Sequence, residues 1–341
     1  MRIIVYGDPH WCKYSSIVRK RGKKYSLRLE NLINSINWVE KLSYEQDCSL
    51  SVCLGDFFDN CDLNSEELTA LSDINWNDTI SHYFIVGNHE MGINDLSISS
   101  SHLFQSFPNI EVVDTCFTDS FPEGFELTFI PYILEENRKP INEYISLPNP
   151  ETKRILFMHN DIKGIQMGKF ISKAGFEIDE IENYCDICFN GHIHNKGKIG
   201  NKIINAGNIT GQNFSEDASI YNHCAYIIDT DTLTIEEFEN PFAFNFYKID
   251  FTSGITDFEI KDNAVCTIRC FDKDVNQVKE WIHSKSIVES RIVLTQQNVG
   301  VSSIMEVETF TIDHIKQFNE FVLSTMDNTD ILLEELSEVS K

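Results

Sequence analysis

The 341-residue sequence has no run of 18 apolar residues, so it contains no segment long enough to cross a membrane as a helix. The apolar residues at its start run within a few positions into glycine and aspartate, which is too short for a signal peptide. Basic residues are scarce, with 28 lysines and arginines against 53 acidic residues and a net charge of −25. The sequence therefore predicts a cytoplasmic protein without a membrane partner, and the charge argues against free, non-specific binding to nucleic acid.

Close cysteine pairs are also rare. Only Cys185 and Cys188 form a C-x-x-C pair, and no second pair follows to complete a zinc knuckle. We therefore expect the ten cysteines to be reduced, and this pair to be small buried side chains. No internal repeat or low-complexity stretch occurs, and the length suits about two domains.

The sequence does contain short apolar runs, each followed by polar residues that can bind metals. The central one is 50–54, which predicts a buried strand, and Gly55 then allows a turn that places Asp56 at its end. The other runs and their polar residues are 2–6 with Asp8 and His10, 82–86 with Asn88 and His89, 154–158 with His159, and 186–190 with His192 and His194. Ligands collect at the carboxyl ends of strands in open α/β sheets, so we expect these side chains to meet.

Helices are expected between the first strands. Apolar residues recur at helical spacing over 25–42, and Asn64 is a plausible capped start of a second helix. Three strand-then-helix units predict a mainly parallel sheet. Residues 110–133 suggest antiparallel strands or a second sheet, 164–178 a loop over the site, and 202–206 and 224–229 strands that complete the sheet. We also expect His192 and His194 to point the same way from an extended segment.

This set of residues predicts a metal centre. A carboxylate such as Asp56 can bridge two metal ions, and the remaining groups supply imidazole and oxygen ligands. Phosphodiester hydrolysis needs a deprotonated water and charge neutralisation on the phosphate, which two divalent ions supply together. Ligands without thiolate suit manganese, with magnesium as the alternative. Five further histidines lie outside the pattern and are expected to be structural or exposed: His82, His102, His223, His283 and His314.

The series resembles the calcineurin-like metallophosphoesterase superfamily, and the whole chain looks like the SbcD-type DNA nuclease subunit, especially its phage forms. The resemblance rests on the five motifs and on the glycine-containing loop 164–175, and it is looser beyond residue 245. It implies an α/β fold: a metallophosphoesterase β-sandwich flanked by helices with βαβαβ motifs, a small α/β cap domain and C-terminal helices. By motif match, Asp56 would be shared between the two ions. The first ion would be held by Asp8, His10, Asp56 and His194, and the second by Asp56, Asn88, His159 and His192. His89 would protonate the leaving group or steady the phosphate.

The resemblance also implies domains and partners. Residues 1–245 would form the nuclease domain, 246–300 a small DNA-facing cap, and 301–341 helices that dock on an SbcC-type coiled-coil ATPase. DNA would be the substrate of this exonuclease or endonuclease in recombination and repair, in a bacterial or phage-infected cell, and a homodimer is compatible with it. The alternative is that the terminal helices pack as part of the chain's own core.

Two departures leave the substrate class open. Glu90 stands where these nucleases usually have aspartate, and the segment 205–208 lacks the usual Gly-Ser pair. A stand-alone metallophosphatase or cyclic-nucleotide phosphodiesterase is therefore an alternative, and a non-catalytic scaffold of a DNA-processing complex is a second one.

One basic cluster stands out in this acidic sequence. It consists of Arg19, Arg21, Lys23 and Lys24, with Lys20 and Arg28 nearby. Because the cluster follows His10 by a few residues, we expect the first four to contact DNA, although a solvated loop explains them equally well.

Overall fold

The computed structural model of the chain describes residues 1–15, 18–167, 170–255 and 258–295. The predicted docking helices at 301–341 and His314 lie outside the described residues. Within the described residues, no helix is both long and apolar enough to span a bilayer.

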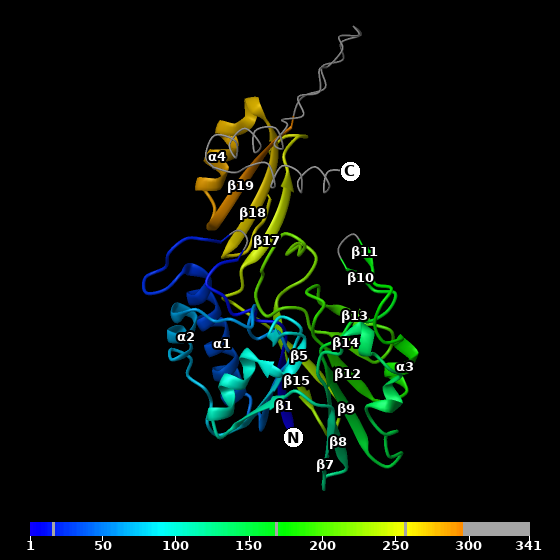
Figure 1. The fold of residues 1–341 in the computed structure, drawn as a ribbon. Coiled ribbons are helices and arrows are strands. Elements are labelled where there is room, and N and C mark those ends of the chain that lie inside the picture. Colours follow the sequence, from blue (N-terminus) through cyan, green and yellow to red (C-terminus); the bar gives the residue numbers. More distant parts are fainter. Residues whose placement is uncertain (16–17, 168–169, 256–257, 296–341) are drawn as a thin grey trace, which may run out of the picture. The chain divides into compact units, whose positions relative to one another are not determined.

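The predicted metal-ligand motifs follow the strands of two six-stranded sheets (Figure 1). The first has the order β16-β15-β1-β2-β3-β6, with β1, β2, β3 and β6 parallel. Its strands are β1 (Arg2–Tyr6), β2 (Leu50–Cys53), β3 (Ser81–Ile85), β6 (Ile110–Val113), β15 (Cys224–Asp229) and β16 (Ile235–Glu239). The register pairs Tyr6 with Cys53 and Cys53 with Phe84, so the polar residues that follow these strands emerge at the same edge.

The second sheet has the order β13-β14-β12-β9-β8-β7, with β14, β12, β9 and β8 parallel. Its strands are β7 (Phe117–Phe121), β8 (Phe125–Ile130), β9 (Lys153–Met158), β12 (Ile187–Asn190), β13 (Gly197–Ile199) and β14 (Ile203–Asn205). Met158 pairs with Asn190, so His159 and His192 follow neighbouring strand ends. The region 110–133 thus belongs to both sheets, and the predicted strands near 202–206 and 224–229 lie in different ones.

The main core lies between the two sheets, because alternate residues of their central strands face each other there. It includes Val5 and Val52 from the first sheet and Leu127, Phe157 and Phe189 from the second, all fully buried. Burial of this apolar surface is the dominant favourable term in folding. The two sheets are therefore held face to face, which brings their carboxyl ends, and the motifs on them, together.

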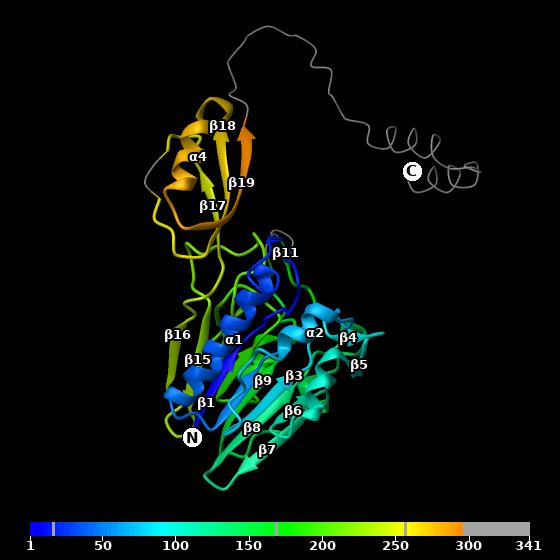
Figure 2. The same ribbon diagram turned by 90° about the vertical axis from the view of Figure 1, so that its left-hand side faces the viewer.

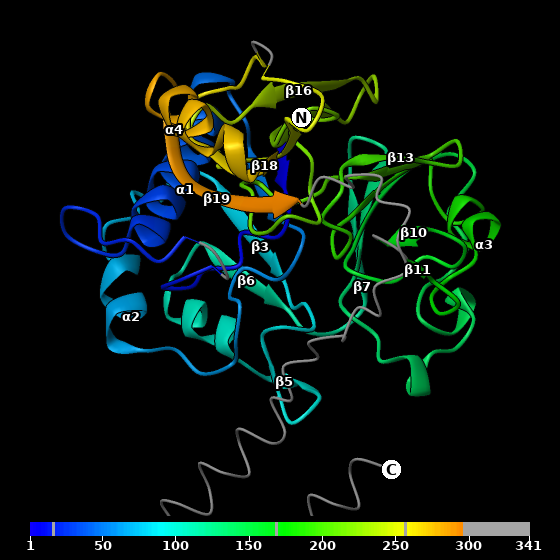
Figure 3. The same ribbon diagram turned by 90° about the horizontal axis from the view of Figure 1, so that it is seen from above.

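Helices cover the outer faces of this sandwich. Helix α1 (Leu27–Glu45) begins at the N-cap Ser26 and packs Leu29, Leu32 and Ile36 against the first sheet. Helix α2 (Ser65–Leu71) begins with a capping box at Asn64, as the sequence predicts. Helix α3 (Ile178–Glu182) packs on the second sheet, and Figure 3 shows it on the side opposite α1 and α2. The β-sandwich flanked by helices is confirmed.

The third predicted helix is absent. After β3 the described chain forms a hairpin, β4 (Met91–Gly92) with β5 (Asp95–Ser99), and then the 3₁₀ helix η1 (Ser100–Ser106). This hairpin and η1 occupy the connection from β3 to β6, so no α-helix forms between these two strands. Short 3₁₀ helices η2 (Glu135–Asn137) and η3 (Ile141–Glu143) follow β8. The predicted loop at 164–178 contains a small hairpin, β10 (Gln166–Met167) with β11 (Phe170–Ile171).

A third sheet follows the sandwich. It is fully parallel, with the order β17 (Asn245–Asp250), β18 (Ala264–Phe271) and β19 (Ile287–Thr295) (Figure 2). Helix α4 (Val275–His283), preceded by the 3₁₀ turn η4 (Asp272–Asp274), packs Val278 and Trp281 into its own apolar cluster. The predicted strand–helix–strand order is therefore present, with one further strand before it. The predicted division at residues 245 and 300 stays a prediction.

Candidate metal centre

The motif residues are held by strained backbone where the strands end. Asp8, His10, Asp56 and His192 all have positive φ, at 41°, 48°, 46° and 70°. Such conformations are uncommon for residues other than glycine and cost about 1–3 kcal/mol each, so they persist only where surrounding structure imposes them. Here the amide of His10 donates to the carbonyl of Asp56 at 2.9 Å, which links two of the strained turns. The sandwich therefore fixes these side chains before any ligand arrives.

Glycine makes the close approach of the turns sterically feasible. A Cβ at Gly191 would stand 2.7 Å from Asp8 Oδ1 and 2.8 Å from His159 Nδ1. Gly55 has φ 108°, and a Cβ there would collide with the His159 ring. Larger residues at either position would push the two sheets' loops apart.

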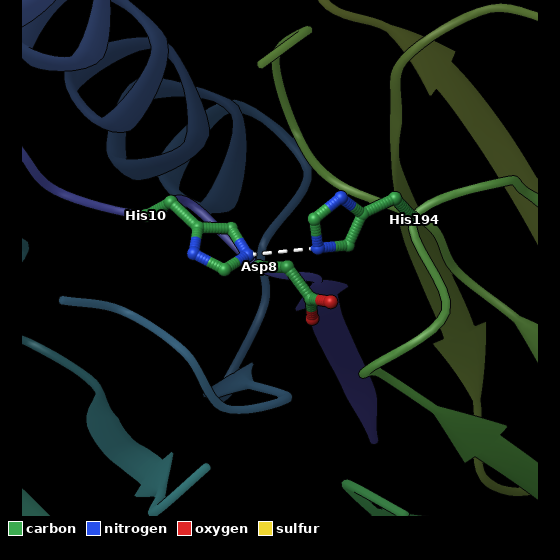
Figure 4. A group of neighbouring side chains, drawn as sticks. All are labelled: Asp8, His10 and His194. Carbon is green, nitrogen blue, oxygen red and sulfur yellow. Dashed lines mark hydrogen bonds between the residues drawn. The ribbon is translucent and has the colours of Figure 1, made fainter. Parts of the chain in front are cut away.

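One group of side chains consists of Asp8, His10 and His194 (Figure 4). The Nε2 atoms of His10 and His194 lie 2.9 Å apart, and His10 Nδ1 lies 3.0 Å from Asp59 Oδ1. Because Asp59 favours a proton on Nδ1, His10 presents a lone pair at Nε2. Burial lowers the pKa of both imidazoles. Two neutral rings therefore face each other with ligand-type nitrogen atoms.

Asp8 completes this group as a buried carboxylate. Both of its oxygens are inaccessible and form no hydrogen bond within the described residues; His159 Nδ1 lies 3.8 Å from Oδ1, but this nitrogen is 2.8 Å from the carbonyl of Leu54. Burial raises its pKa to about 7. Unpaired buried carboxylate oxygens are costly unless a cation or hydrogen-bond donor faces them. This observation is the strongest sign in the structure that a metal ion belongs here.

The second group consists of Asp56, His159 and His192. Asp56 Oδ2 lies 3.2 Å from His159 Nε2, and the amide oxygen of Asn88 lies 2.9 Å from His192 Nδ1 and 3.3 Å from His159 Nε2. His159 Nδ1 is 2.8 Å from the carbonyl of Leu54, which orients the ring and directs Nε2 inward. Nitrogen and oxygen donors thus converge on a second point.

Asp56 lies between the two groups. Its Oδ2 atom is 3.9 Å from His10 Nε2 as well as 3.2 Å from His159 Nε2, while Oδ1 accepts the amide of His89 at 3.0 Å. The structure therefore brings all seven predicted ligands together around one carboxylate. Which residue binds which ion stays a prediction.

The expectation for His192 and His194 is wrong in its geometry. The segment is a bend, with positive φ at His192 and a 2.8 Å hydrogen bond from Ile193 N to Gly191 O. The two rings consequently enter different groups, because the bend at His192 breaks the extended conformation in which side chains two residues apart point the same way. His192 is also held by Asp161, whose Oδ1 lies 3.1 Å from Nε2.

His89 lies at the edge of the centre. Its side chain is 40% exposed, and its ring is 4.6 Å from that of His10 in an edge-on arrangement. Nδ1 lies 3.1 Å from the Asp59 carbonyl and 3.5 Å from Asp59 Oδ1. The hydrogen bond to Asp59 raises the pKa of His89 to about 9. The position of this imidazole and its raised pKa therefore favour the protonated form of His89.

Sequence reasoning missed three supporting acids. Asp59 contacts His10 and His89, Asp161 contacts His192, and the buried Glu216 lies 3.9 Å from His194 Nδ1. Asp59 and Asp161 follow Asp56 and His159 at short spacing, which is a local signal. Glu216 has none, because only the fold brings its segment to His194.

Glu90 supports the loops behind the centre. It is fully buried, and its carboxylate accepts the amides of Gly87 at 2.7 Å and Phe58 at 3.1 Å. Burial raises its pKa to about 7. Its longer side chain thus connects the loops after β2 and β3. This role does not depend on which substrate the protein takes.

The predicted basic DNA contacts differ in their surroundings. Arg21 pairs with Glu66, and Lys24 pairs with Asp73 at 2.7 Å. Arg19 and Lys23 are exposed, and no ion pair involves either within the described residues. Arg28 belongs to a different class, since it is buried and donates to the carbonyls of Pro9 and Gly211.

The remaining histidines and the cysteines agree with the expected structural roles. His82 and His223 are buried, His102 lies 3.0 Å from Asp114, and His283 is exposed. All ten cysteines lie within the described residues, and none of them forms a disulfide. Cys185 and Cys188 are buried.

The donor set fits two divalent ions. The group of Asp8, His10 and His194 and the group of Asp56, His159 and His192 each offer ligand atoms within 4.8 Å of one another, and Asn88 adds an oxygen beside the second. Imidazole, carboxylate and amide donors without thiolate suit first-row divalent ions. The fit is supported independently by the buried oxygens of Asp8, which form no hydrogen bond within the described residues.

Comparison with known proteins places the chain in a family. Residues 1–196 match the model of the calcineurin-like phosphoesterases. No curated protein matches. Among solved structures, a dimetal phosphatase from Danio rerio shares 10% identity at a TM-score of 0.43, over 70% of this chain and 96% of that one. The family model spans more than half of the chain and covers every predicted metal ligand, so the chain belongs to the calcineurin-like phosphoesterases, which are metal-dependent hydrolases.

Proposed function

We propose that the protein is a two-metal phosphodiesterase that cleaves DNA as the nuclease subunit of an SbcCD-type complex, with manganese as its ion. The observation that carries the hydrolytic part is the arrangement of two ligand groups around Asp56, with His89 beside them. The DNA part rests on the sequence resemblance and on the additional α/β sheet after the sandwich.

The residues divide the work as follows. Asp8, His10 and His194 would hold one ion, Asn88, His159 and His192 the other, and Asp56 both. Bound ions would supply Lewis acidity and an activated water.

His89 would donate its proton to the leaving oxygen. Asp59 engages Nδ1, which leaves Nε2 on a partly exposed ring for that transfer. The same carboxylate orients His10, so it couples the acid to the ligand set.

A stand-alone phosphatase or cyclic-nucleotide phosphodiesterase is the second candidate, and the net charge of −25 favours it. Glu90 adds little to that case, because it binds backbone amides away from the surface. A scaffold without activity is the third candidate, and the completeness of the ligand set speaks against it.

Three substrates separate these functions. Manganese-dependent release of nucleotides from linear duplex DNA supports the nuclease, and hydrolysis of 4-nitrophenyl phosphate alone supports the phosphatase. Hydrolysis of bis(4-nitrophenyl) phosphate without DNA cleavage, even with the ATPase present, would contradict the DNA proposal. Asp56→Asn should abolish all activity, whereas the exposed Asp62→Asn is the matched control.

The partner proposal concerns residues 301–341, which lie outside the described residues. We propose that they dock on the coiled-coil ATPase, in the cytoplasm of a bacterial or phage-infected cell. A chain truncated after Gly300 should keep diesterase activity but no longer co-purify with the ATPase. A truncated chain that is insoluble, or melts far below the intact one without any partner, would assign these residues to the chain's own core.

A further inference from the structure

A cavity of about 460 Å³ opens next to the metal centre. The β4–β5 hairpin provides one wall, including Ile93 and Leu96, and the segment after β8 provides the other, including Tyr132 and Tyr144. The hairpin begins at Met91, two residues after His89. The cavity is therefore joined through the chain itself to the proposed general acid.

Tyr132 forms the boundary between cavity and centre. Its ring lies 5.5 Å from that of His192 and 6.3 Å from that of His159, and the same side chain lines the cavity. Its amide donates to the carbonyl of Val86 at 3.0 Å, which fixes it to the end of β3. A group bound in the cavity would thus lie directly beside a phosphate bound at the metal centre.

The chemistry of the walls selects an uncharged, flat ligand. Aliphatic and aromatic side chains dominate, and Asn94 and Asn137 add amides that can both donate and accept hydrogen bonds. Among the described residues, the lining includes no lysine or arginine, and its one carboxylate, Asp95, accepts from the amide and hydroxyl of Ser97 at 2.9 and 2.8 Å. These residues offer a phosphate no cation. A heteroaromatic base would find an aromatic face and amide partners.

The hairpin tip adds an apolar edge at a conformational cost. Ile93 and Asn94 have φ of 49° and 57°, and the Ile93 side chain is 86% exposed. Turns of this kind favour Asn, Asp or Gly, and a β-branched residue in the left-handed region is an outlier. Stability alone would therefore select another residue than isoleucine at this tip.

We propose that this cavity binds the nucleobase next to the scissile phosphate, with the base against Tyr132. The inference rests on the proposed phosphodiesterase function and names its substrate as a nucleoside ester. A base can enter only when it is unstacked, so the cavity favours a frayed end or a single strand.

The test compares two esters with the same leaving group. One is the 4-nitrophenyl ester of thymidine 5′-phosphate, and the other is methyl 4-nitrophenyl phosphate. We expect kcat/KM to be about tenfold or more higher for the nucleoside ester, because this is the usual contribution of one base stacked on an aromatic side chain. Tyr132→Leu should remove most of this preference, mainly through KM. An unchanged preference in Tyr132→Leu would overturn the proposal.

A second variant and matched controls separate recognition from folding. Ile93→Asn accepts the left-handed turn and removes the apolar edge, so it should reduce the preference without lowering the melting temperature. Tyr44→Leu and Ile220→Asn make the same replacements at exposed residues outside the cavity and should leave the preference unaltered. A preference that falls in these controls too would overturn the assignment to this cavity.

A binding measurement keeps the cavity distinct from the chemistry. With the Asp56→Asn protein, fluorescence anisotropy compares a short labelled oligothymidylate with the same strand made abasic at its end. Tighter binding of the intact strand, lost in Tyr132→Leu, supports the cavity, and equal affinities overturn it. If the wild-type protein hydrolysed neither ester in the presence of manganese, the proposed phosphodiesterase function would be refuted instead.

Discussion

His10 Nε2 and His194 Nε2 lie 2.9 Å apart, although the two histidines follow strands of different sheets. Two neutral nitrogens at this distance can share a cation, and a cation bound there would connect the sheets. Manganese should therefore raise the melting temperature by several degrees. A ligand that binds only the folded state at a hundredfold its Kd adds about 2.7 kcal/mol.

His194→Ala should remove a large part of that gain, because the ion loses a ligand from the second sheet. The exposed His283→Ala should keep the full gain. Calorimetry with and without manganese measures both. An equal gain in His194→Ala and wild type would contradict the assignment of His194 as a ligand.

His89→Asn should lower kcat by about 10²–10⁴, the range for lost acid catalysis, while the ions stay bound. The reason is geometric: the one group that includes His89 consists of His10, Asp59 and His89 among the described residues, and it contains neither Asp8 nor Asp56. Metal analysis of the purified variant, beside a rate assay, tests this. Loss of the ions from His89→Asn would make it a ligand instead.

Asp59→Asn tests a positioning residue. The Oδ1 atom of Asp59 lies 3.0 Å from His10 Nδ1 and 3.0 Å from Gln212 Nε2. Losing such support typically costs 10–100-fold in activity or metal affinity, and we expect about this loss.

The pH profile distinguishes positioning from simple damage. Asp59 raises the pKa of His89 to about 9, and a general acid loses activity as the pH rises through its pKa. Without the Asp59 charge that pKa falls, so the alkaline decline of kcat should begin at lower pH. A lower rate with an unshifted profile would indicate damage alone, and Asp62→Asn is the control.

The sequence predicted the centre because its ligands follow apolar strands at fixed, short distances, as Asp56 follows 50–54. Contacts between residues far apart in the sequence could not be predicted in this way. Glu216 and Gln212 approach His194 and Asp59 only because the segment after β14 folds back over the centre. The bend at His192 could not be predicted from the sequence either, because the surrounding loops impose its positive φ.

The fold shows the same division. Strands and helices with strong periodicity, such as α1, were predicted within two or three residues of their ends. The β4–β5 hairpin was missed, since its strands are short and its turn contains isoleucine where glycine would mark a turn. Sheet membership of β6, β7 and β8 depends on pairing between distant strands, so it stayed open.

The structure sharpens the prediction for the basic cluster. Arg21 and Lys24 already form ion pairs within the chain, so Arg19 and Lys23 remain as the better DNA contacts. Arg19→Ala/Lys23→Ala should weaken DNA binding and lower the slope of log K against log salt by about one unit per lost contact. Lys139→Ala/Lys198→Ala removes the same charge elsewhere. An equal slope in both double variants would identify a solvated loop.

Glu40 on α1 is a buried acid remote from the metal centre. Its carboxylate accepts the amide of Asn77 at 2.9 Å, and Oε1 lies 3.8 Å from His82 Nδ1. Burial raises the pKa of Glu40 from 4.5 to about 8, whereas burial lowers that of His82. His82 is therefore uncharged at neutral pH and does not compensate a charge on Glu40.

This predicts the sign of a stability change with pH. Between pH 4.5 and about 8 the folded chain keeps a proton on Glu40 that the unfolded chain has lost, so the free energy of unfolding falls as pH rises. The side chain in Glu40→Gln can still accept a hydrogen bond from the Asn77 amide and cannot ionise. The free energy of unfolding of this variant should therefore exceed that of the wild type at pH 8, and the difference should disappear near pH 4. Denaturant titrations in EDTA across this range, with the exposed Glu45→Gln as control, measure the difference. A difference that is constant with pH would show that Glu40 stays ionised in the folded protein.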